Sequence, residues 1–172
     1  LHSTSRRQRQ MCIRDRIDTL ISARTLDKSI SFPKPSFDGK YLMFTLSDYG
    51  NFSIWHKEAD LWLLDLKTGA YRNLEEVNSD DTESYHNWSS NSHWFVFSSR
   101  RGDGLYTRLY ISSVDGQGRI GKPFLLPQQD PYTFYDQLIY SYNVPEFVSA
   151  PVQWDKREMA KGLMSKERVK VK

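Results

Sequence analysis

Residues 35–45 read PSFDGKYLMFT, and residues 88–98 read WSSNSHWFVFS. The two stretches align position by position, with aromatic, apolar and small polar residues in the same order and Phe44 on Phe97. A second match follows after loops of unequal length, because residues 61–66 (LWLLDL) align with residues that read LYISSV. The chain therefore contains a repeat of roughly 50 residues, a period that is typical of units made of short strands.

Each repeat predicts four strands. Asp38-Gly39 between two β-rich runs is a strong hairpin signal, because both turn positions tolerate positive φ. Continuous apolar runs such as the one in residues 41–46 indicate inner strands that are buried on both faces. We expect strands at 32–37, 41–46, 60–66 and 71–74 in the first unit, and at 85–89, 94–99, 106–114 and 123–126 in the second. Four short antiparallel strands per repeat are typical of a β-propeller blade.

The predicted fold is an all-β propeller fragment of about two four-stranded antiparallel blades plus remnants, with a short, partly helical C-terminal tail. Two blades cannot close a ring that needs roughly 4 to 8, so we expect the remaining blades in the same chain. The predicted segments are 1–16, a disordered arm; 17–31, compatible with one or two strands from a preceding blade; 32–75 and 76–126, two blades; and 127–172, a C-terminal extension. In the extension, residues 132–142 predict a short helix or an aromatic-packed loop, and 155–165 a polar helix.

Composition limits the function. The single cysteine, Cys12, permits neither an intrachain disulfide nor a cysteine-based metal site. The net charge of +3 comes from the two ends, because residues 17–154 carry a net charge of −5. Nucleic-acid binding needs clustered positive charge on the folded part, so we expect no nucleic-acid partner. No apolar run approaches the roughly 18 residues of a membrane span.

A resemblance to a known family adds to this reading. The motif PSFDGKYLMFT followed by ADLWLLDLKTG, then NWSSNSHWFVFSS followed by RLYISSVDG, resembles the TolB-type, WD-like propeller repeat. It is also similar to the C-terminal part of TolB-like periplasmic propellers of Bacteroidetes-type bacteria. The resemblance implies a periplasmic or envelope-associated scaffold that binds protein. Separately, MCIRDR and its Arg-rich lead-in resemble translated sequencing-adaptor sequence, so we exclude residues 1–16 from functional reasoning.

The order of the strands predicts where binding residues gather. Consecutive antiparallel strands place alternate connections on opposite faces of a propeller, and one face receives only minimal turns. The other face receives the long loops at 47–58, 76–86 and 100–105, and we call it the long-loop face. Rigid scaffolds concentrate binding residues on such loops. The candidate partner-binding residues are Tyr49, Phe52, Trp55, His56, Asp80, Asp81, Glu83, Tyr85, His86, Arg100 and Arg101.

Most groups on this face allow more than one interpretation. Tyr49, Phe52 and Trp55 anchor an interface, or Phe52 and Trp55 pack beneath their own loop. Asp80, Asp81 and Glu83 form a solvated acidic loop, a hard-cation site or a contact for a basic partner, but six or more convergent oxygens are needed for calcium. The arginines Arg100 and Arg101 form surface salt bridges with that loop, or bind carboxylate or phosphate. His86 is read as a structural histidine. We expect neither metal nor cofactor.

No catalytic motif is present. The sequence lacks GxSxG, HExxH, GxxxxGK[ST], GxGxxG and CxxCH. We therefore expect a non-enzymatic, periplasmic propeller scaffold that binds protein in the cell envelope. The alternative is the propeller of a larger hydrolase, a prolyl-oligopeptidase-like peptidase or a glycan-active enzyme, whose catalytic part lies elsewhere.

Overall fold

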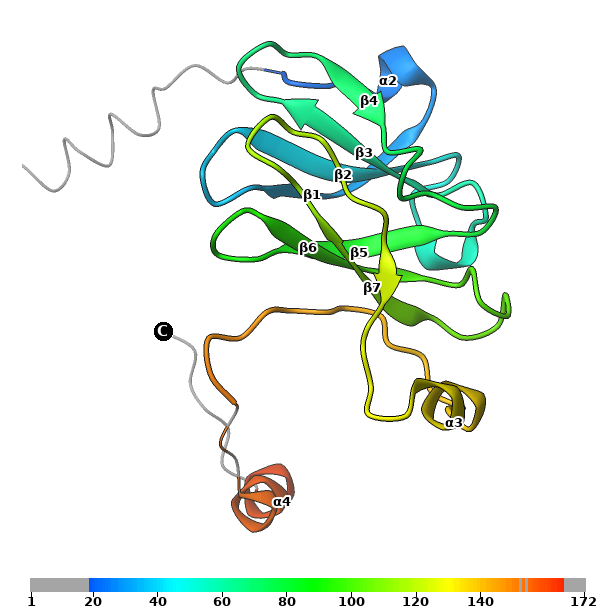
Figure 1. The fold of residues 1–172 in the computed structure, drawn as a ribbon, viewed down its shortest axis with the longest axis vertical. Coiled ribbons are helices and arrows are strands. Elements are labelled where there is room, and N and C mark those ends of the chain that lie inside the picture. The colour runs from blue at the N-terminus through cyan, green and yellow to red at the C-terminus, as the bar shows by residue number, and fades with distance from the viewer. Residues whose placement is uncertain (1–18, 152, 154, 166–172) are drawn as a thin grey trace, which may run out of the picture.

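The computed structural model describes residues 19–151, 153 and 155–165, which form two stacked four-stranded antiparallel sheets (Figure 1). The first sheet contains β1 Ser29–Pro35, β2 Tyr41–Ser47, β3 Asp60–Asp65 and β4 Tyr71–Asn73. The second contains β5 Glu83–Trp88, β6 Trp94–Ser99, β7 Arg108–Ser113 and β8 Phe124–Leu125. Each sheet is an uninterrupted meander, and this confirms the predicted fold class of two four-stranded antiparallel units.

Four short helical segments accompany the sheets within the described residues. They are α2 Ala23–Leu26, the 3-10 turn η1 Ser53–Trp55, α3 Pro131–Asp136 and α4 Lys156–Met164. Of the two alternatives for residues 132–142, a helix forms, although α3 is shorter than that range and begins one residue earlier. The polar helix predicted at 155–165 is confirmed as α4, where the Asp155 carboxylate accepts a hydrogen bond from the Arg157 N–H at 2.7 Å. No helix among the described residues is long and apolar enough to span a membrane.

The hairpin turns explain why the two repeats fold alike. In the first, Asp38 Oδ1 accepts a hydrogen bond from Ser36 Oγ at 2.7 Å, and Gly39 adopts a φ of +71°. In the second, Asn91 Oδ1 accepts the same bond from Ser89 Oγ at 2.7 Å, and Ser92 adopts a φ of +59°. Asn91-Ser92 therefore builds the same turn as Asp38-Gly39, because the side-chain oxygen of either Asp or Asn can accept the hydrogen bond from the serine hydroxyl.

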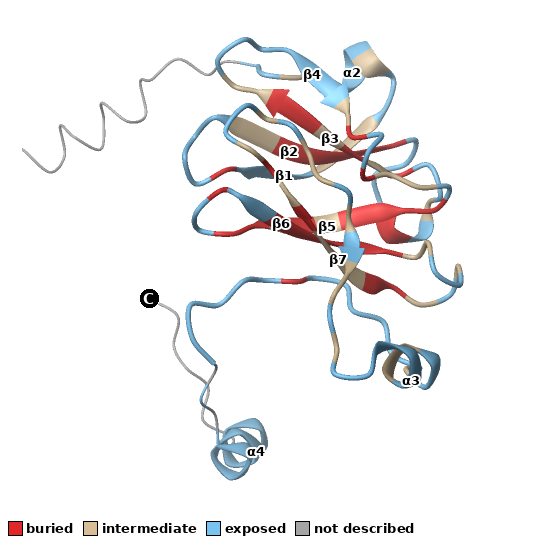
Figure 2. Ribbon diagram, in the orientation of Figure 1, coloured by how far each residue is buried: buried red, intermediate tan, exposed pale blue. Residues whose placement is uncertain are grey.

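The core lies between the sheets. Side chains alternate along β2, so Met43 faces the second sheet and Phe44 faces away from it. In β6 the equivalent residue of Phe44 is Phe97, which faces the first sheet and is fully buried. Figure 2 shows buried residues concentrated on the strands, while α4 is exposed along its whole length. The inter-sheet cluster comprises Met43, Leu61, Leu63, Leu74, Val77, Trp88, Phe95, Phe97 and Val114.

The segment before the first sheet differs from the strand interpretation of residues 17–31. Residues 23–26 form α2, and residues 29–31 already belong to β1, so the first strand starts three residues earlier than predicted. Ile21 and Leu26 pack against the Phe44 cluster, which gives the helical path its apolar contacts. Ile17, Asp18 and the adaptor-like arm at 1–16 lie outside the described residues, and the division into domains stays a prediction.

The chain returns across the second sheet after α3. Residues 138–145 run beneath β6 and β7 on the side that faces away from the first sheet (Figure 1). Ser98 Oγ donates to the Asn143 carbonyl at 2.7 Å, and the Tyr142 N–H donates to the Thr107 carbonyl at 3.2 Å. The sequence assigned no role to this segment, which covers a sheet face through hydroxyl and backbone hydrogen bonds.

Candidate functional site

The structure brings together the three loops of the long-loop face. The loop with η1 lies at the opposite end of the stack from the β1–β2 turn (Figure 1). Ser53 Oγ and Ser84 Oγ are 2.8 Å apart, and Thr82 Oγ1 donates to the Ser53 carbonyl at 2.9 Å. The guanidinium of Arg100 lies 4.8 Å from the ring centroid of Trp55. Contacts between the loops therefore join both sheets at this face.

The aromatic loop turns its large side chains outward. Ser53 and Ile54 are buried in η1, whereas the exposed fractions of Phe52 and Trp55 are 74% and 63%. Tyr49 is also exposed, and its ring lies 5.8 Å from that of His56. Of the two alternatives for this loop, the packed one is wrong for Phe52 and Trp55, because Ile54 fills the space beneath the loop.

The loop is ordered by its own backbone contacts. A ring nitrogen of His56, Nε2, lies 3.0 Å from the Asn51 carbonyl, which can only accept, so this nitrogen carries the hydrogen. Phe52 adopts a left-handed φ of +54°, a conformation that costs a residue with a side chain about 1 to 2 kcal/mol. The fold recovers little of this cost through Phe52 itself, since the ring is mostly in solvent.

The three acidic candidates occupy different environments. Asp80 is exposed. Asp81 is 8% exposed, and its Oδ1 accepts a hydrogen bond from the Thr82 N–H at 2.8 Å. Glu83 is fully buried at the start of β5. The interpretation of all three as one solvated acidic loop is therefore wrong for Asp81 and Glu83, and only Asp80 is exposed. Among the described residues, no three His, Cys, Asp or Glu side chains converge as a metal site would require.

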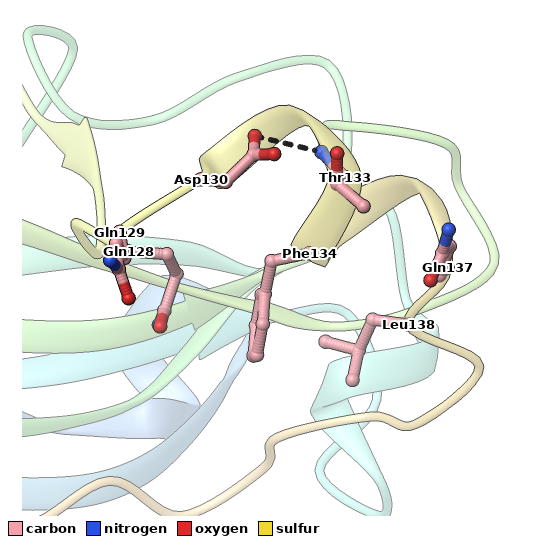
Figure 3. A pocket seen from close by; sticks show the side chains of 7 residues that line it. All are labelled: Gln128, Gln129, Asp130, Thr133, Phe134, Gln137 and Leu138. Atoms are coloured by element: carbon pink, nitrogen blue, oxygen red, sulfur yellow. Dashed lines mark hydrogen bonds between the residues drawn. The ribbon is translucent and has the colours of Figure 1, made fainter.

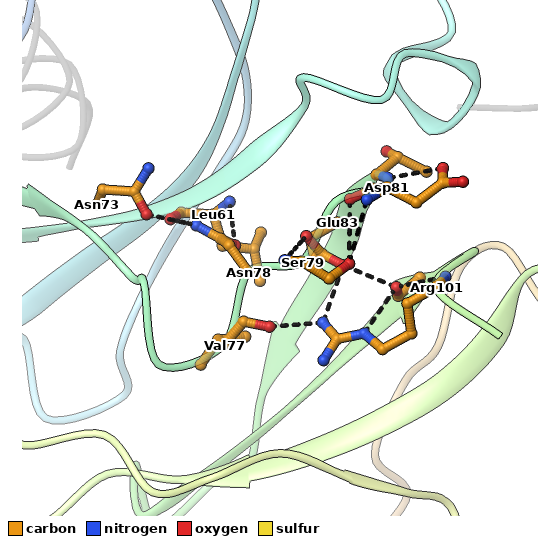
Figure 4. Close-up of polar contacts among 10 residues, drawn as sticks. Leu61, Asn73, Val77, Asn78, Ser79, Asp81, Glu83 and Arg101 are labelled. Atoms are coloured by element: carbon orange, nitrogen blue, oxygen red, sulfur yellow. Dashed lines mark hydrogen bonds and ion pairs between the residues drawn. The ribbon is translucent and has the colours of Figure 1, made fainter. Parts of the chain in front are cut away.

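Glu83 and Arg101 form the centre of a buried polar network (Figure 4). Arg101 Nη2 donates to Glu83 Oε1 at 2.8 Å and to the Val77 carbonyl at 2.5 Å. Ser99 Oγ also donates to Glu83 Oε1 at 2.7 Å, and Ser79 Oγ donates to the same oxygen. Burial raises the pKa of Glu83, and the hydrogen bond from Ser99 and the charge of Arg101 oppose this shift.

The two arginines serve different purposes. Among the described residues, the salt bridge expected between the arginines and the acidic residues forms only from Arg101 to Glu83, and it is buried at Glu83 and not on the surface. The guanidinium of Arg101 also lies 4.6 Å from the ring centroid of Tyr110. Arg100 donates from Nε to the Gly104 carbonyl at 3.1 Å, with Nη2 on the same oxygen. Arg100 therefore keeps an uncompensated positive charge, and Arg101 does not.

Tyr85 and His86 lie in a β-bulge, away from the loops. Tyr85 has a left-handed φ of +50°. Its ring packs at a tilt against Phe32, which occupies the equivalent bulge of β1, with the ring centroids 4.8 Å apart. His86 is 2% exposed, and its Nε2 lies 3.0 Å from the Met43 carbonyl. The structural reading of His86 agrees with this placement. Burial lowers the pKa of His86 to about 4.

This pKa predicts a pH dependence of stability. The folded pKa of His86 lies below its ordinary value of 6.5, so the stability that the neutral ring supports is present above pH 6.5 and is lost as the pH falls toward about 4. The loss should reach about 3 kcal/mol. Urea denaturation at several pH values should show this slope in the wild type and not in His86→Gln. Parallel curves for the two proteins would contradict the assignment, and the comparison cancels the contribution of Glu83, which both share.

One cavity lies among the loops of the long-loop face, and another lies at α3. One, of about 300 Å³, lies between the loops and is lined by Lys57, Ser79, Asp80, Asp81, Arg100, Arg101 and Gly104. We call it the inter-loop pocket. The other, of about 560 Å³, lies at α3 and is lined by Gln128, Gln129, Asp130, Thr133, Phe134, Gln137 and Leu138 (Figure 3). Sequence reasoning missed the second cavity, although Asp130 before Pro131 is a recognisable helix start.

Comparisons with known proteins do not identify a family for this chain. No protein-family model matches the sequence, and no curated protein matches it. Among solved structures, the crystal structure of TolB from Acinetobacter baumannii is similar, with a TM-score of 0.35 and 24% sequence identity over 52% of this chain. The match covers 20% of that TolB chain. The fold described above rests on the two sheets themselves.

Proposed function

We propose that this protein is a non-catalytic propeller-type scaffold that binds a protein partner of the bacterial cell envelope, in the periplasm, through its long-loop face. Each sheet is one blade, and further blades complete the ring. The two sheets stack face to face as neighbouring blades do. The far side of the first sheet carries a second apolar cluster around Phe44, Leu46 and Leu64, which a preceding blade would cover.

One observation carries the proposal. The aromatic loop buries Ser53 and Ile54 and leaves Phe52 and Trp55 in solvent, with Phe52 in a strained backbone conformation. Large aromatic side chains on an ordered loop are the groups that most often anchor protein interfaces. Because the loop is already ordered, binding does not carry the entropic cost of ordering it.

The test is capture of envelope proteins by the purified chain. Phe52→Ala/Trp55→Ala should lose a partner that the wild type retains, by at least about tenfold, since hot-spot aromatics contribute 2 kcal/mol or more each. Folding should be unaffected, because both side chains are exposed. The matched control is Tyr132→Ala, which removes an aromatic side chain that is 88% exposed on α3.

The partner should be identified by placing a photo-crosslinking amino acid at position 55 and sequencing the adducts. Equal capture by the wild type and the double variant, or equal loss in Tyr132→Ala, would refute the role of the long-loop face. The β-rich circular dichroism of each variant must match that of the wild type for the comparison to hold.

A further inference from the structure

The inter-loop pocket is surrounded by charges that the fold leaves without partners. Of its charged lining residues, Arg101 is neutralised by Glu83. Among the described residues, no hydrogen bond or ion pair reaches the side chains of Lys57 and Asp80, and Arg100 contacts only a carbonyl and the Trp55 ring. The pocket therefore has two unpaired charges of each sign, supplied by three different loops.

Asp81 supplies the buried member of this set. It is more than nine-tenths buried, and only Oδ1 is used, in the hydrogen bond from the Thr82 N–H. In the described part of the chain nothing donates to Oδ2, which lines the pocket beside Gly104. A Cβ on Gly104 would lie 3.5 Å from Oδ2, so the missing side chain leaves this oxygen open. Oδ2 therefore stays open to the pocket, where a cationic donor of a ligand can reach it.

Charges of opposite sign held apart around one cavity match a dipolar ligand. A ligand with only an ammonium group would satisfy Asp80 and Asp81 but would be repelled by Arg100 and Lys57, and a simple anion would meet the converse problem. A ligand with both groups satisfies both sides. We propose that the inter-loop pocket binds the zwitterionic head group of an α-amino acid, with the ammonium on Asp81 and Asp80 and the carboxylate on Arg100 and Lys57.

The charge arrangement gives each group a defined role. The planar guanidinium of Arg100 is oriented by the Gly104 carbonyl through Nε and Nη2, which leaves Nη1 free to donate to a carboxylate. Trp55 holds the same guanidinium from one side. Charge-assisted hydrogen bonds of this kind are stronger than neutral ones, so both halves of the zwitterion contribute to binding.

The test uses L-alanine as the probe and NMR chemical-shift titration of the full chain as the measurement. L-alanine should shift backbone amide signals of the three loops around the pocket. N-acetyl-L-alanine, which lacks the ammonium, and L-alaninamide, which lacks the carboxylate, should each bind at least about tenfold more weakly. Equal shifts from either blocked compound, or no shift from L-alanine, would overturn the proposal.

Variants of the pocket then test which residue binds the ammonium and which binds the carboxylate of L-alanine. Asp81→Asn and Arg100→Gln should each weaken L-alanine binding by about tenfold or more, whereas Lys67→Gln, in the turn after β3, should leave it unchanged. A variant with undiminished affinity at either pocket position would contradict the proposal. If Asp81→Asn fails to fold, the comparison of the three compounds on the wild type decides the question alone.

This proposal is independent of partner capture by the aromatic loop. Phe52→Ala/Trp55→Ala does not separate the two proposals, because Trp55 contacts Arg100 of the pocket. Phe52→Ala alone leaves every pocket residue in place and should bind L-alanine as the wild type does. Failure of protein capture with retained L-alanine binding would refute the proposed function and leave the zwitterion site intact, and the reverse result would refute only the site.

Discussion

Arg101→Met should lower the free energy of unfolding by about 3 to 5 kcal/mol at neutral pH. The substitution keeps an apolar stem of similar length and removes the charge that neutralises Glu83, which is fully buried. It also removes donors to the Val77 carbonyl and Ser99 Oγ. Urea denaturation followed by circular dichroism measures the effect. The matched control is Arg100→Met, which loses a carbonyl contact and a ring contact but leaves no buried charge, and should cost about 1 kcal/mol.

The pH dependence of this loss identifies its cause. Burial already raises the pKa of Glu83 from 4.5, and loss of the Arg101 charge should raise it further. A group whose folded pKa is raised contributes stability below its unfolded pKa and loses it as the pH rises through the folded pKa. The cost of Arg101→Met should therefore be smallest below pH 4.5 and grow toward neutrality.

A double variant separates the buried charge from lost packing. Glu83→Gln/Arg101→Met removes both charges, so it should be more stable than Arg101→Met alone at neutral pH and should lose most of the added pH dependence. A cost for Arg101→Met that is the same at all pH values, or is not reduced in the double variant, would show that the pair does not act through the charge of Glu83.

Phe97→Ala should lower the free energy of unfolding by about 3 to 5 kcal/mol. Phe97 lies between the two sheets, with ring centroids of Phe95 and Tyr110 at 5.9 and 5.8 Å, so the surroundings on both sides are strands that cannot move in to fill the space. The cost of a cavity is largest where the site cannot collapse. Urea denaturation at neutral pH measures the loss.

The repeat provides a matched control for this prediction. Phe44 occupies the equivalent position of the first repeat and is also fully buried, but it faces the far side of the first sheet beside an apolar groove of about 340 Å³. Its neighbours there include Ile21 and Ile30, which can relax toward a truncated side chain. Phe44→Ala should therefore fall at the lower end of the same range, and a larger loss than for Phe97→Ala would contradict a core centred between the sheets.

The strands that the sequence predicted correctly are those with strong local signals. The strand β6 lies at the residues predicted for it, and the starts of β2 and β3 also agree, because apolar runs and turn residues act over a few positions. The first strand was misplaced by three residues, since nothing in the local pattern shows that a bulge at Phe32 lets β1 continue back to Ser29. The path of residues 138–145 across the second sheet was not predicted, because its partners, such as Ser98 and Thr107, lie far away in the sequence.

The residues of the candidate site were harder to predict from the sequence, because their exposure depends on tertiary packing. The strand order alone predicted that the three long loops lie on one face, and the contacts between them in the structure agree with this prediction. The strand order did not predict which residues of those loops are exposed. In the aromatic loop, Ile54 is buried, although the sequence pattern would equally allow Phe52 or Trp55 to be the buried residue. In the acidic loop, Glu83 is buried, although Asp80, three residues earlier, is exposed.

The amino-acid sequence by itself therefore determined the repeat, the antiparallel strands and the turns that join them, because hairpin chemistry and side-chain alternation are local properties. Only the tertiary structure decided that Arg101 is neutralised by Glu83 while Arg100 and Asp81 keep free charged atoms at one pocket. The reason is physical: the partner of a charge is set by which segments of the two sheets pack together, and two adjacent arginines on one loop carry no local information about which of them will meet a buried carboxylate.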